Sequence, residues 1–254
     1  MSGRTALVTG ASAGIGLAFA RELAARGYDL VLVARSADRL AEVATELRTG
    51  TGAQVEVLPA DLADRGSLQK VEERVADEAR PVDLLVNNAG FGLKHPFLDN
   101  GVEDEQRMLD VLVTAVMRLS HAAAGVMVER GSGAIVNVSS VAGFLPRGTY
   151  SAAKAYVTSF SVWLDLTYRR RGVRAMALCP GFVRTEFHGR MDVSRGSAPR
   201  FLWLQPERVV REALADLERG RRVSVPSKRY KLLTALARWV PRSLLAPFQG
   251  MGRR

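Results

Sequence analysis

The chain has 254 residues, of which 47% are apolar and 24% are charged. This size and composition suit one globular domain with its own core and exclude wholesale disorder. No uninterrupted apolar run approaches the ~20 residues of a membrane-spanning helix, and the first residues lead into an apolar pattern without a secretory leader. The single cysteine, Cys179, excludes a disulfide framework and a multi-cysteine metal site. We therefore expect a cytoplasmic protein without a bound metal.

The net charge of +10 belongs to the C-terminal part of the sequence. Ten Lys and Arg residues and no acid lie between Arg219 and Arg254, so the preceding residues are neutral overall. A charge confined in this way does not predict nucleic-acid binding by the main body. We expect residues 1–220 to form the main domain, and residues 221–254 to form a basic extension packed on it or at an interface.

Short runs rich in Val, Leu and Ile alternate with helix-length segments along the chain. The apolar runs are residues 5–8, 29–34, 54–58, 83–86, 134–138 and 173–178. Nearly continuous apolar strands, each followed by a helical pattern, are typical of a parallel sheet buried on both faces. The sequence therefore predicts an α/β fold in a single domain, with a doubly wound, Rossmann-type parallel sheet and helices on both faces.

A glycine-rich segment, TGASAGIG at residues 9–16, joins the first predicted strand to the first helix. Glycine permits a sharp turn and a close approach of the backbone to a pyrophosphate, while the helix N-terminus supplies free N–H groups. The alternative is a plain turn, since tight strand–helix turns use glycine anyway. Its place after the first strand favours a nucleotide-binding loop.

The second predicted strand is followed by Arg35 and, one turn later, Arg39. In NAD-binding folds an acid near this point accepts hydrogen bonds from the ribose 2′-hydroxyl, whereas a basic residue suits the 2′-phosphate of NADP. No acid stands at the strand end here. The sequence favours NADP over NAD, and the alternative is a pair of solvated arginines.

A tyrosine and a lysine four residues apart, Tyr150 and Lys154, share one face of a predicted helix. Tyrosine has a pKa of ~10 and shuttles protons poorly at neutral pH unless a nearby cation favours the phenolate. Ser139 and Ser140 follow the fifth strand at the same sheet edge, where serines are otherwise helix caps or turn formers. The sequence contains neither a Gly-x-Ser-x-Gly elbow nor a pair of metal ligands, so it does not favour a hydrolase.

These motifs together resemble the short-chain dehydrogenase/reductase family. They are TGASAGIG at 9–16, NNAG at 87–90, Ser140, Tyr150-x-x-x-Lys154 and PGFVRT at 180–185, in this order. The resemblance covers about residues 4–220. It implies hydride transfer between a nicotinamide and a carbonyl or secondary alcohol, with Tyr150 as general acid/base. It also implies that Lys154 binds ribose hydroxyls and lowers the pKa of Tyr150, and that Ser140 binds the substrate oxygen.

The resemblance further implies a set of cofactor-binding residues. They are Gly10, Ser12, Gly14, Ile15 and Gly16 for the pyrophosphate, Asp61 and Leu62 for the adenine, Asn88, Tyr150 and Lys154 for the ribose side, and Val183 and Thr185 for the nicotinamide carboxamide, beside Arg35 and Arg39.

Two positions depart from the family pattern. Leu112 stands where the family usually carries an asparagine that helps to hold a water in a proton relay to the lysine. A leucine cannot make the side-chain hydrogen bonds, although its backbone carbonyl still accepts one. The interval from Ser140 to Tyr150 is also short, which indicates a trimmed loop. Leu112 keeps an alternative open, namely a non-catalytic NADP-binding sensor or scaffold.

The remaining expectations concern the substrate and the partners. Residues 187–205 contain Phe201 and Trp203 and predict either a lid over a largely apolar substrate or a packed surface loop. Family resemblance implies a homodimer or homotetramer through the long helices that contain Leu112 and Tyr156. An amphipathic pattern at residues 231–240 places Leu232, Leu233, Leu236, Trp239 and Val240 on one helical face. We expect this face to dock on the domain or on a partner subunit. The alternatives are weak contact with an anionic membrane surface and a lid over an apolar substrate that bears an anionic group.

Overall fold

The predicted sheet is confirmed in the computed structural model, which describes residues 3–185 and 199–239. Seven parallel strands follow the order β3-β2-β1-β4-β5-β6-β7. They are β1 Thr5–Thr9, β2 Asp29–Ala34, β3 Val55–Pro59, β4 Leu84–Asn87, β5 Gly133–Val138, β6 Val173–Leu178 and β7 Val223–Ser224. The first six lie within a residue or two of the predicted apolar runs.

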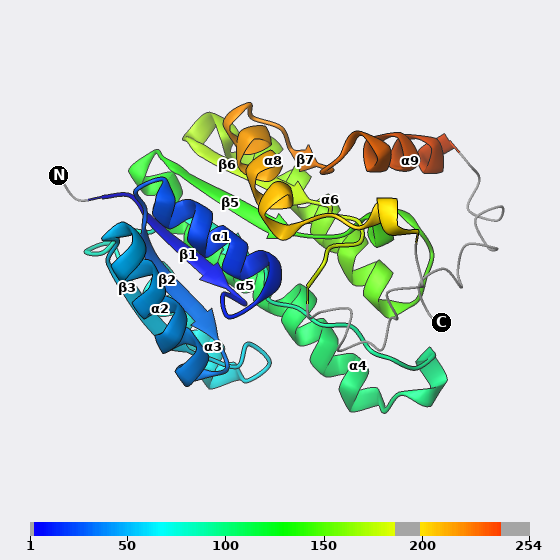
Figure 1. Cartoon of the computed structure of the whole chain (residues 1–254), viewed down its shortest axis with the longest axis horizontal. Helices are drawn as coiled ribbons and strands as arrows, with labels where there is room; N and C mark the ends of the chain where they lie inside the picture. The colour runs from blue at the N-terminus through cyan, green and yellow to red at the C-terminus, as the bar shows by residue number, and fades with distance from the viewer. Residues whose placement is uncertain (1–2, 186–198, 240–254) are drawn as a thin grey trace.

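Helices cover both faces of this sheet (Figure 1). One face packs against α1 Gly14–Ala25, α2 Ala37–Thr51 and α8 Pro206–Glu218. The other packs against α3 Arg65–Val75, α5 Ala115–Arg130 and α6 Thr149–Tyr168. In β1, Ala6 and Val8 belong to the first core and Leu7 to the second, and all three are fully buried. Burial on both faces explains why the strands read as continuous apolar runs.

A long helical stretch runs from Val102 to Arg130. It comprises α4 Val102–Leu109, a π-helical turn η2 at Asp110–Thr114, and α5. Within the described residues it is the one stretch long and apolar enough to cross a membrane, although charged and polar residues interrupt its apolar sequence. Half of its most apolar window is buried inside the domain. This stretch is therefore a core helix that packs against one face of the sheet.

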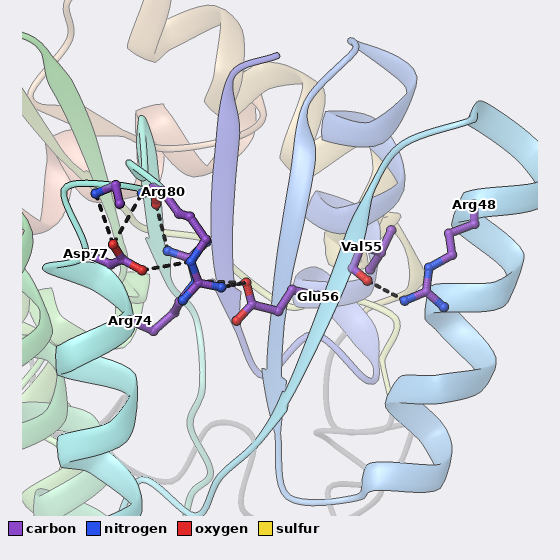
Figure 2. Close-up of polar contacts among 7 residues, drawn as sticks. Arg48, Val55, Glu56, Arg74, Asp77 and Arg80 are labelled. Carbon is purple, nitrogen blue, oxygen red and sulfur yellow. Dashed lines mark hydrogen bonds and ion pairs between the residues drawn. The ribbon is translucent and has the colours of Figure 1, made fainter. Parts of the chain in front are cut away.

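The edge strand β3 is held from two sides (Figure 2). Arg74 of α3 is 8% exposed, and its guanidinium donates to Glu56 of β3 at 2.8 Å and to the carbonyl of Arg80 at 2.8 Å. Arg48 of α2 donates to the Val55 carbonyl from the opposite side. These contacts satisfy polar groups of a strand that has a neighbour on one side alone.

The C-terminal segment begins inside the sheet. β7 pairs with β6, so the predicted extension begins with a strand of the main sheet. The last described helix is α9, Lys228–Trp239. Tyr230 and Thr234 face the domain and are 4% and 9% exposed, whereas Leu232 and Leu233 are 62% and 49% exposed. Leu232 and Leu233 therefore do not dock on this domain, and docking of these two leucines on a partner subunit stays a prediction. The side chains of Leu236, Trp239 and Val240 lie outside the described residues.

Candidate active site

The predicted site residues gather at the carboxyl edge of the sheet. The glycine loop follows β1, Asn88 follows β4, Ser140 follows β5 and Val183 follows β6. Chain connections diverge between β1 and β4, since β2 and β3 lie on one side and β5 to β7 on the other. Such a switch point is where open α/β sheets bind ligands. Among the described residues, no cluster of three His, Cys, Asp or Glu side chains is placed to hold a metal ion.

The glycine loop has a conformation that requires its glycines. Gly10 and Gly14 have φ of 66° and 56°, in the left-handed region. A Cβ at Gly16 would lie 2.2 Å from the Gly10 oxygen and 2.4 Å from the Asn88 amide nitrogen. α1 then begins at Gly14 with no side-chain cap from Ala13. Its first N–H groups, beside the partly buried Ser12 and Ile15, are suited to bind an anion.

Asn88 braces this loop from the neighbouring strand. Its side-chain amide donates to the carbonyls of Thr9 at 2.9 Å and Gly10 at 3.3 Å. The Thr9 hydroxyl in turn accepts from the backbone N–H groups of Asn88 and Ala89. Asn88 therefore holds the turn after β1, and its place beside a cofactor ribose stays a prediction.

The two arginines after β2 differ in their contacts. Arg35 is exposed and forms no ion pair within the part of the chain that the structure describes. Arg39 pairs with Glu42 at 2.6 Å, and its backbone N–H donates to the Ser36 hydroxyl that caps α2. Arg35 thus provides an exposed cation next to a helix N-terminus, which is the chemistry that suits a phosphate.

Asp61 and Leu62 follow β3, as the adenine-binding assignment requires. Asp61 accepts from the Ala63 N–H at 3.0 Å and from Arg107 of α4 at 2.5 Å, while Leu62 is 6% exposed. The sequence gave no indication of Arg107. Its partner lies 46 positions away, and an arginine on an exposed helical face carries no motif of its own.

Tyr150, Ser140 and Lys154 are brought together at the start of α6. The Ser140 hydroxyl is hydrogen-bonded to the Tyr150 phenol and accepts from the Ala142 N–H at 3.1 Å. The Lys154 ammonium lies 5.8 Å from the centre of the Tyr150 ring and donates to the Val138 carbonyl at 2.7 Å. A hydroxyl, a phenol and an ammonium therefore share one small region at the sheet edge.

Burial sets the protonation of this group. It raises the pKa of Tyr150 to about 12, against the smaller lowering effect of the Ser140 hydrogen bond, and it lowers the pKa of Lys154 to about 8. The net shift of the Tyr150 pKa is upward because of burial, and the expectation that the charge of Lys154 lowers this pKa stays a prediction. A low-dielectric environment disfavours the charged form of either group, so the phenol keeps its proton.

The start of α6 is fixed against the segment after β5. Ser139 donates to the Lys154 carbonyl at 2.7 Å and shares a hydrogen bond of 2.7 Å with Thr158. In the short turn η3, Val141–Phe144, a Cβ at Gly143 would lie 2.9 Å from the Ala155 nitrogen. The glycine therefore lets the short loop after Ser140 pack directly against the backbone of α6.

Leu112 lies in the π-helical turn and is fully buried. It packs in a small apolar cluster with Met108 and Ala153, against which Tyr150 also packs. A Cβ at Gly90 would lie 2.8 Å from Leu112 Cδ2 and 3.9 Å from Lys154 Nζ. The leucine thus occupies the expected position beside the lysine, where it supplies apolar surface in place of an amide.

The loop after β6 closes over the glycine loop. Val183 is 2% exposed and forms a parallel bridge with Leu204. Thr185 lies beside Gly14, since a Cβ on that glycine would be 3.0 Å from Thr185 Cγ2. Most of the expected lid at residues 187–205 lies outside the described residues. In its described end, Phe201 is 59% exposed and Trp203 contacts Phe182 with 5.4 Å between ring centres.

Comparison with known proteins agrees with this geometry. The family model described as short chain dehydrogenase matches residues 4–195. A very-long-chain 3-oxoacyl-CoA reductase of Anas platyrhynchos is 34% identical over 222 residues, which cover 85% of this chain and 69% of that protein.

Two solved structures extend the comparison. A short-chain dehydrogenase from Sphingobium yanoikuyae in complex with NADPH is 37% identical, with a TM-score of 0.85 over 92% of this chain and 93% of that one. A bulky-bulky ketone specific alcohol dehydrogenase from Comamonas testosteroni is 31% identical, with a TM-score of 0.80 over 94% of this chain and 96% of that one.

Proposed function

Because this chain belongs to the short-chain dehydrogenase/reductase family and is an oxidoreductase, we propose that it is an NADP-dependent carbonyl reductase acting on a largely apolar ketone. The observation that carries the proposal is the grouping of Tyr150, Ser140 and Lys154 at the switch point of the sheet. The reverse reaction, oxidation of a secondary alcohol, uses the same groups.

The residues at the sheet edge fit a bound NADP. The glycine loop leaves a backbone cradle that a Cβ would fill, and the uncapped start of α1 suits the pyrophosphate. Arg35 suits the 2′-phosphate, with Arg39 one turn away. Asp61 and Leu62 would meet the adenine, and Val183 and Thr185 would hold the carboxamide. When bound, the reduced nicotinamide supplies the hydride. The solved Sphingobium relative contains NADPH, which supports this assignment.

The chain itself supplies the proton and orients the carbonyl. Tyr150 donates the phenolic proton to the carbonyl oxygen as that oxygen gains negative charge, and Ser140 donates a hydrogen bond to the same oxygen. The raised pKa of Tyr150 keeps this proton in place at neutral pH, which suits the direction of reduction. Lys154 would bind the ribose hydroxyls, and its charge favours the tyrosinate that remains after proton transfer.

An apolar substrate is favoured by the side chains near the loop after β6. Phe182 and Trp203 pack together there, and Phe201 exposes more than half of its surface. The Comamonas relative is named for bulky-bulky ketones, which supports a ketone with two large substituents.

A panel of aliphatic and aromatic ketones, followed by NADPH absorbance, tests the proposal together with Tyr150→Phe. The variant keeps the ring and loses the exchangeable proton, so we expect turnover to fall by ~100- to 10,000-fold. NADPH affinity should stay close to that of the unmodified enzyme. Tyr168→Phe, at the far end of α6, is the matched control. NADPH binding without turnover of any ketone by the unmodified chain would instead support the sensor or scaffold alternative.

We further propose a cytoplasmic homodimer or homotetramer, in line with family resemblance and with the presence of a single cysteine, Cys179, which is buried. Contact with an anionic membrane surface is supported by a basic groove between α8 and α9, with a volume of about 410 Å³. The groove is lined by Arg208, Arg211, Arg219, Lys228 and Lys231, beside Glu212, Ala215 and Asp216. Leu232 and Leu233 are exposed on α9, beside Lys228 and Lys231 of the groove.

Binding to phosphatidylserine vesicles at low salt tests the membrane contact. We expect Leu232→Ser/Leu233→Ser to abolish this binding, and added salt to weaken it in the unmodified chain. Point substitutions are preferable to removal of the whole segment, because Tyr230 of the same helix is buried in the domain. Binding that survives the double substitution would contradict the contact.

A further inference from the structure

Tyr230 of α9 joins two separate stretches of the chain. Its side chain is 4% exposed. Its hydroxyl accepts a hydrogen bond from the Phe182 N–H at 3.0 Å and donates one to the Leu202 carbonyl at 2.9 Å. Phe182 belongs to the loop after β6, and Leu202 ends the short helical turn η5, Arg200–Leu202. One phenol therefore satisfies a backbone donor and a backbone acceptor on opposite sides of the loop's base.

The ring of Tyr230 lies directly against Gly181. A Cβ at that glycine would lie 1.9 Å from Tyr230 Cζ and 2.2 Å and 2.3 Å from the two Cε atoms. Any residue with a Cβ at position 181 would clash with the ring. The packing of Tyr230 therefore requires glycine at this position. Tyr230 thus contacts two consecutive residues of the loop, one through its face and one through its hydroxyl.

The same loop continues into Val183 and Thr185. The base of the loop is closed by hydrogen bonds from the Leu204 N–H to the Phe182 carbonyl at 2.8 Å and from the Arg184 N–H to the Leu204 carbonyl at 2.9 Å. α9 also packs against η3, the turn that follows Ser140. The phenol of Tyr230 therefore fixes the backbone one residue before Val183, while its helix contacts the other side of the site.

We propose that Tyr230 is a positioning residue for the nicotinamide half of the cofactor site. The inference rests on the proposed function, because it takes Val183 and Thr185 to be the residues that hold the carboxamide. With its hydroxyl shared between Phe182 and Leu202, Tyr230 holds residues 182–185 in place before the cofactor binds, so binding does not bear the cost of ordering them. The C-terminal helix is then part of the active site, although it contributes no group to the reacting atoms.

Two ligands separate this role from a general effect on stability. NADPH contacts the loop through its nicotinamide, whereas 2′-phosphoadenosine-5′-diphosphoribose lacks that ring. Tyr230→Phe removes the hydroxyl and keeps the ring over Gly181. We expect the Kd of NADPH to rise about three- to tenfold, in line with the loss of one or two neutral hydrogen bonds, and the Kd of the truncated ligand to stay unchanged. The matched control is Tyr28→Phe, a half-buried tyrosine that lies beneath Arg4 just before β2, and this substitution should change neither value.

Each result bears on the inference. Unchanged NADPH affinity in Tyr230→Phe, or equal weakening for both ligands, would overturn the positioning role. An unmodified chain that binds no NADPH would instead overturn the proposed function. Hydrogen–deuterium exchange of the unmodified protein decides the matter if the variant does not fold. NADPH, and not the truncated ligand, should then slow exchange in the first turns of α9, and equal effects of the two ligands would overturn the proposal.

Discussion

Arg35 and Arg39 lie one turn apart after β2. Of the two, Arg39 forms an ion pair with Glu42, whereas Arg35 has no acidic partner within the described residues. We expect Arg35→Asp to raise the Kd of NADPH tenfold or more, because a charge-assisted phosphate contact contributes ~1.5–3 kcal/mol. The Kd of NADH should fall or stay constant, since an acid suits the ribose 2′-hydroxyl. Titration with both cofactors measures the change.

Arg39→Ala is the internal control for this prediction. Its guanidinium is already paired with Glu42, so it should weaken NADPH binding less than Arg35→Asp does. Equal affinities of the unmodified enzyme for NADPH and NADH would contradict the role of Arg35.

The buried pair of Lys154 and Tyr150 predicts a pH dependence. The pKa of Lys154 is lowered to about 8, so its charge is present below that pH and is lost as the pH rises through it. Tyr150, with its pKa raised to about 12, keeps its proton throughout this range. We expect kcat/KM for ketone reduction to be level below pH 8 and to fall above it.

Initial rates of NADPH oxidation across this range measure the profile. In Lys154→Arg the guanidinium stays charged, so the decline above pH 8 should disappear even where the absolute rate is lower. A rate that increases through pH 8 would show that deprotonated Lys154 is the active form.

At the scale of elements, the π-helical turn places Leu112 beside the lysine. If the absence of an asparagine side chain at position 112 slows the proton relay to Lys154, Leu112→Asn should raise the rate of turnover or shift its pH–rate profile. The buried amide should also lower the free energy of unfolding by ~1–3 kcal/mol, because Leu112 is surrounded by apolar side chains. Steady-state rates and urea unfolding of the same preparation measure both effects. An unchanged profile in a folded variant would show that a backbone carbonyl is sufficient.

The parts of the fold that the sequence predicts are those with a strong local pattern. Strands buried on both faces read as apolar runs, and the glycine loop is set by left-handed backbone positions. β7 was missed because two residues carry no periodic pattern. The sequence did not single out Tyr230, which faces inward to reach backbone groups on Phe182 and Leu202, because Leu232 and Leu233 carry the apolar pattern of α9. Contacts of this kind depend on tertiary structure and leave no local signal.

At the scale of the whole molecule, the outer face of α6 is aromatic. Tyr156 stacks on Phe160 at 5.7 Å between ring centres, and Phe160 stacks on Trp163 at 5.9 Å. Trp163 is 51% exposed and Leu166 is 60% exposed. Exposed apolar surface of this kind is typical of protein interfaces. Leu112, fully buried, lies away from such a surface.

We expect Trp163→Glu to dissociate the proposed oligomer. A charge at the centre of an apolar interface has no partner after burial, so the assembled state becomes unfavourable. Light scattering coupled to size-exclusion chromatography measures the mass of each species. Leu98→Glu, at an 89% exposed position in η1, Phe97–Asp99, is the control and should leave the mass unchanged. A monomeric unmodified chain would contradict the oligomer.

The bridge between Val183 and Leu204 has a consequence for the cost of closing the chain between these two residues. The bridge joins the backbone at the point where the chain leaves the cofactor site to the backbone just before α8. The entropic cost of closing a loop grows slowly with its length. The bridge therefore ties Val183 to the start of α8 at a cost that depends little on the number of residues between its two partners.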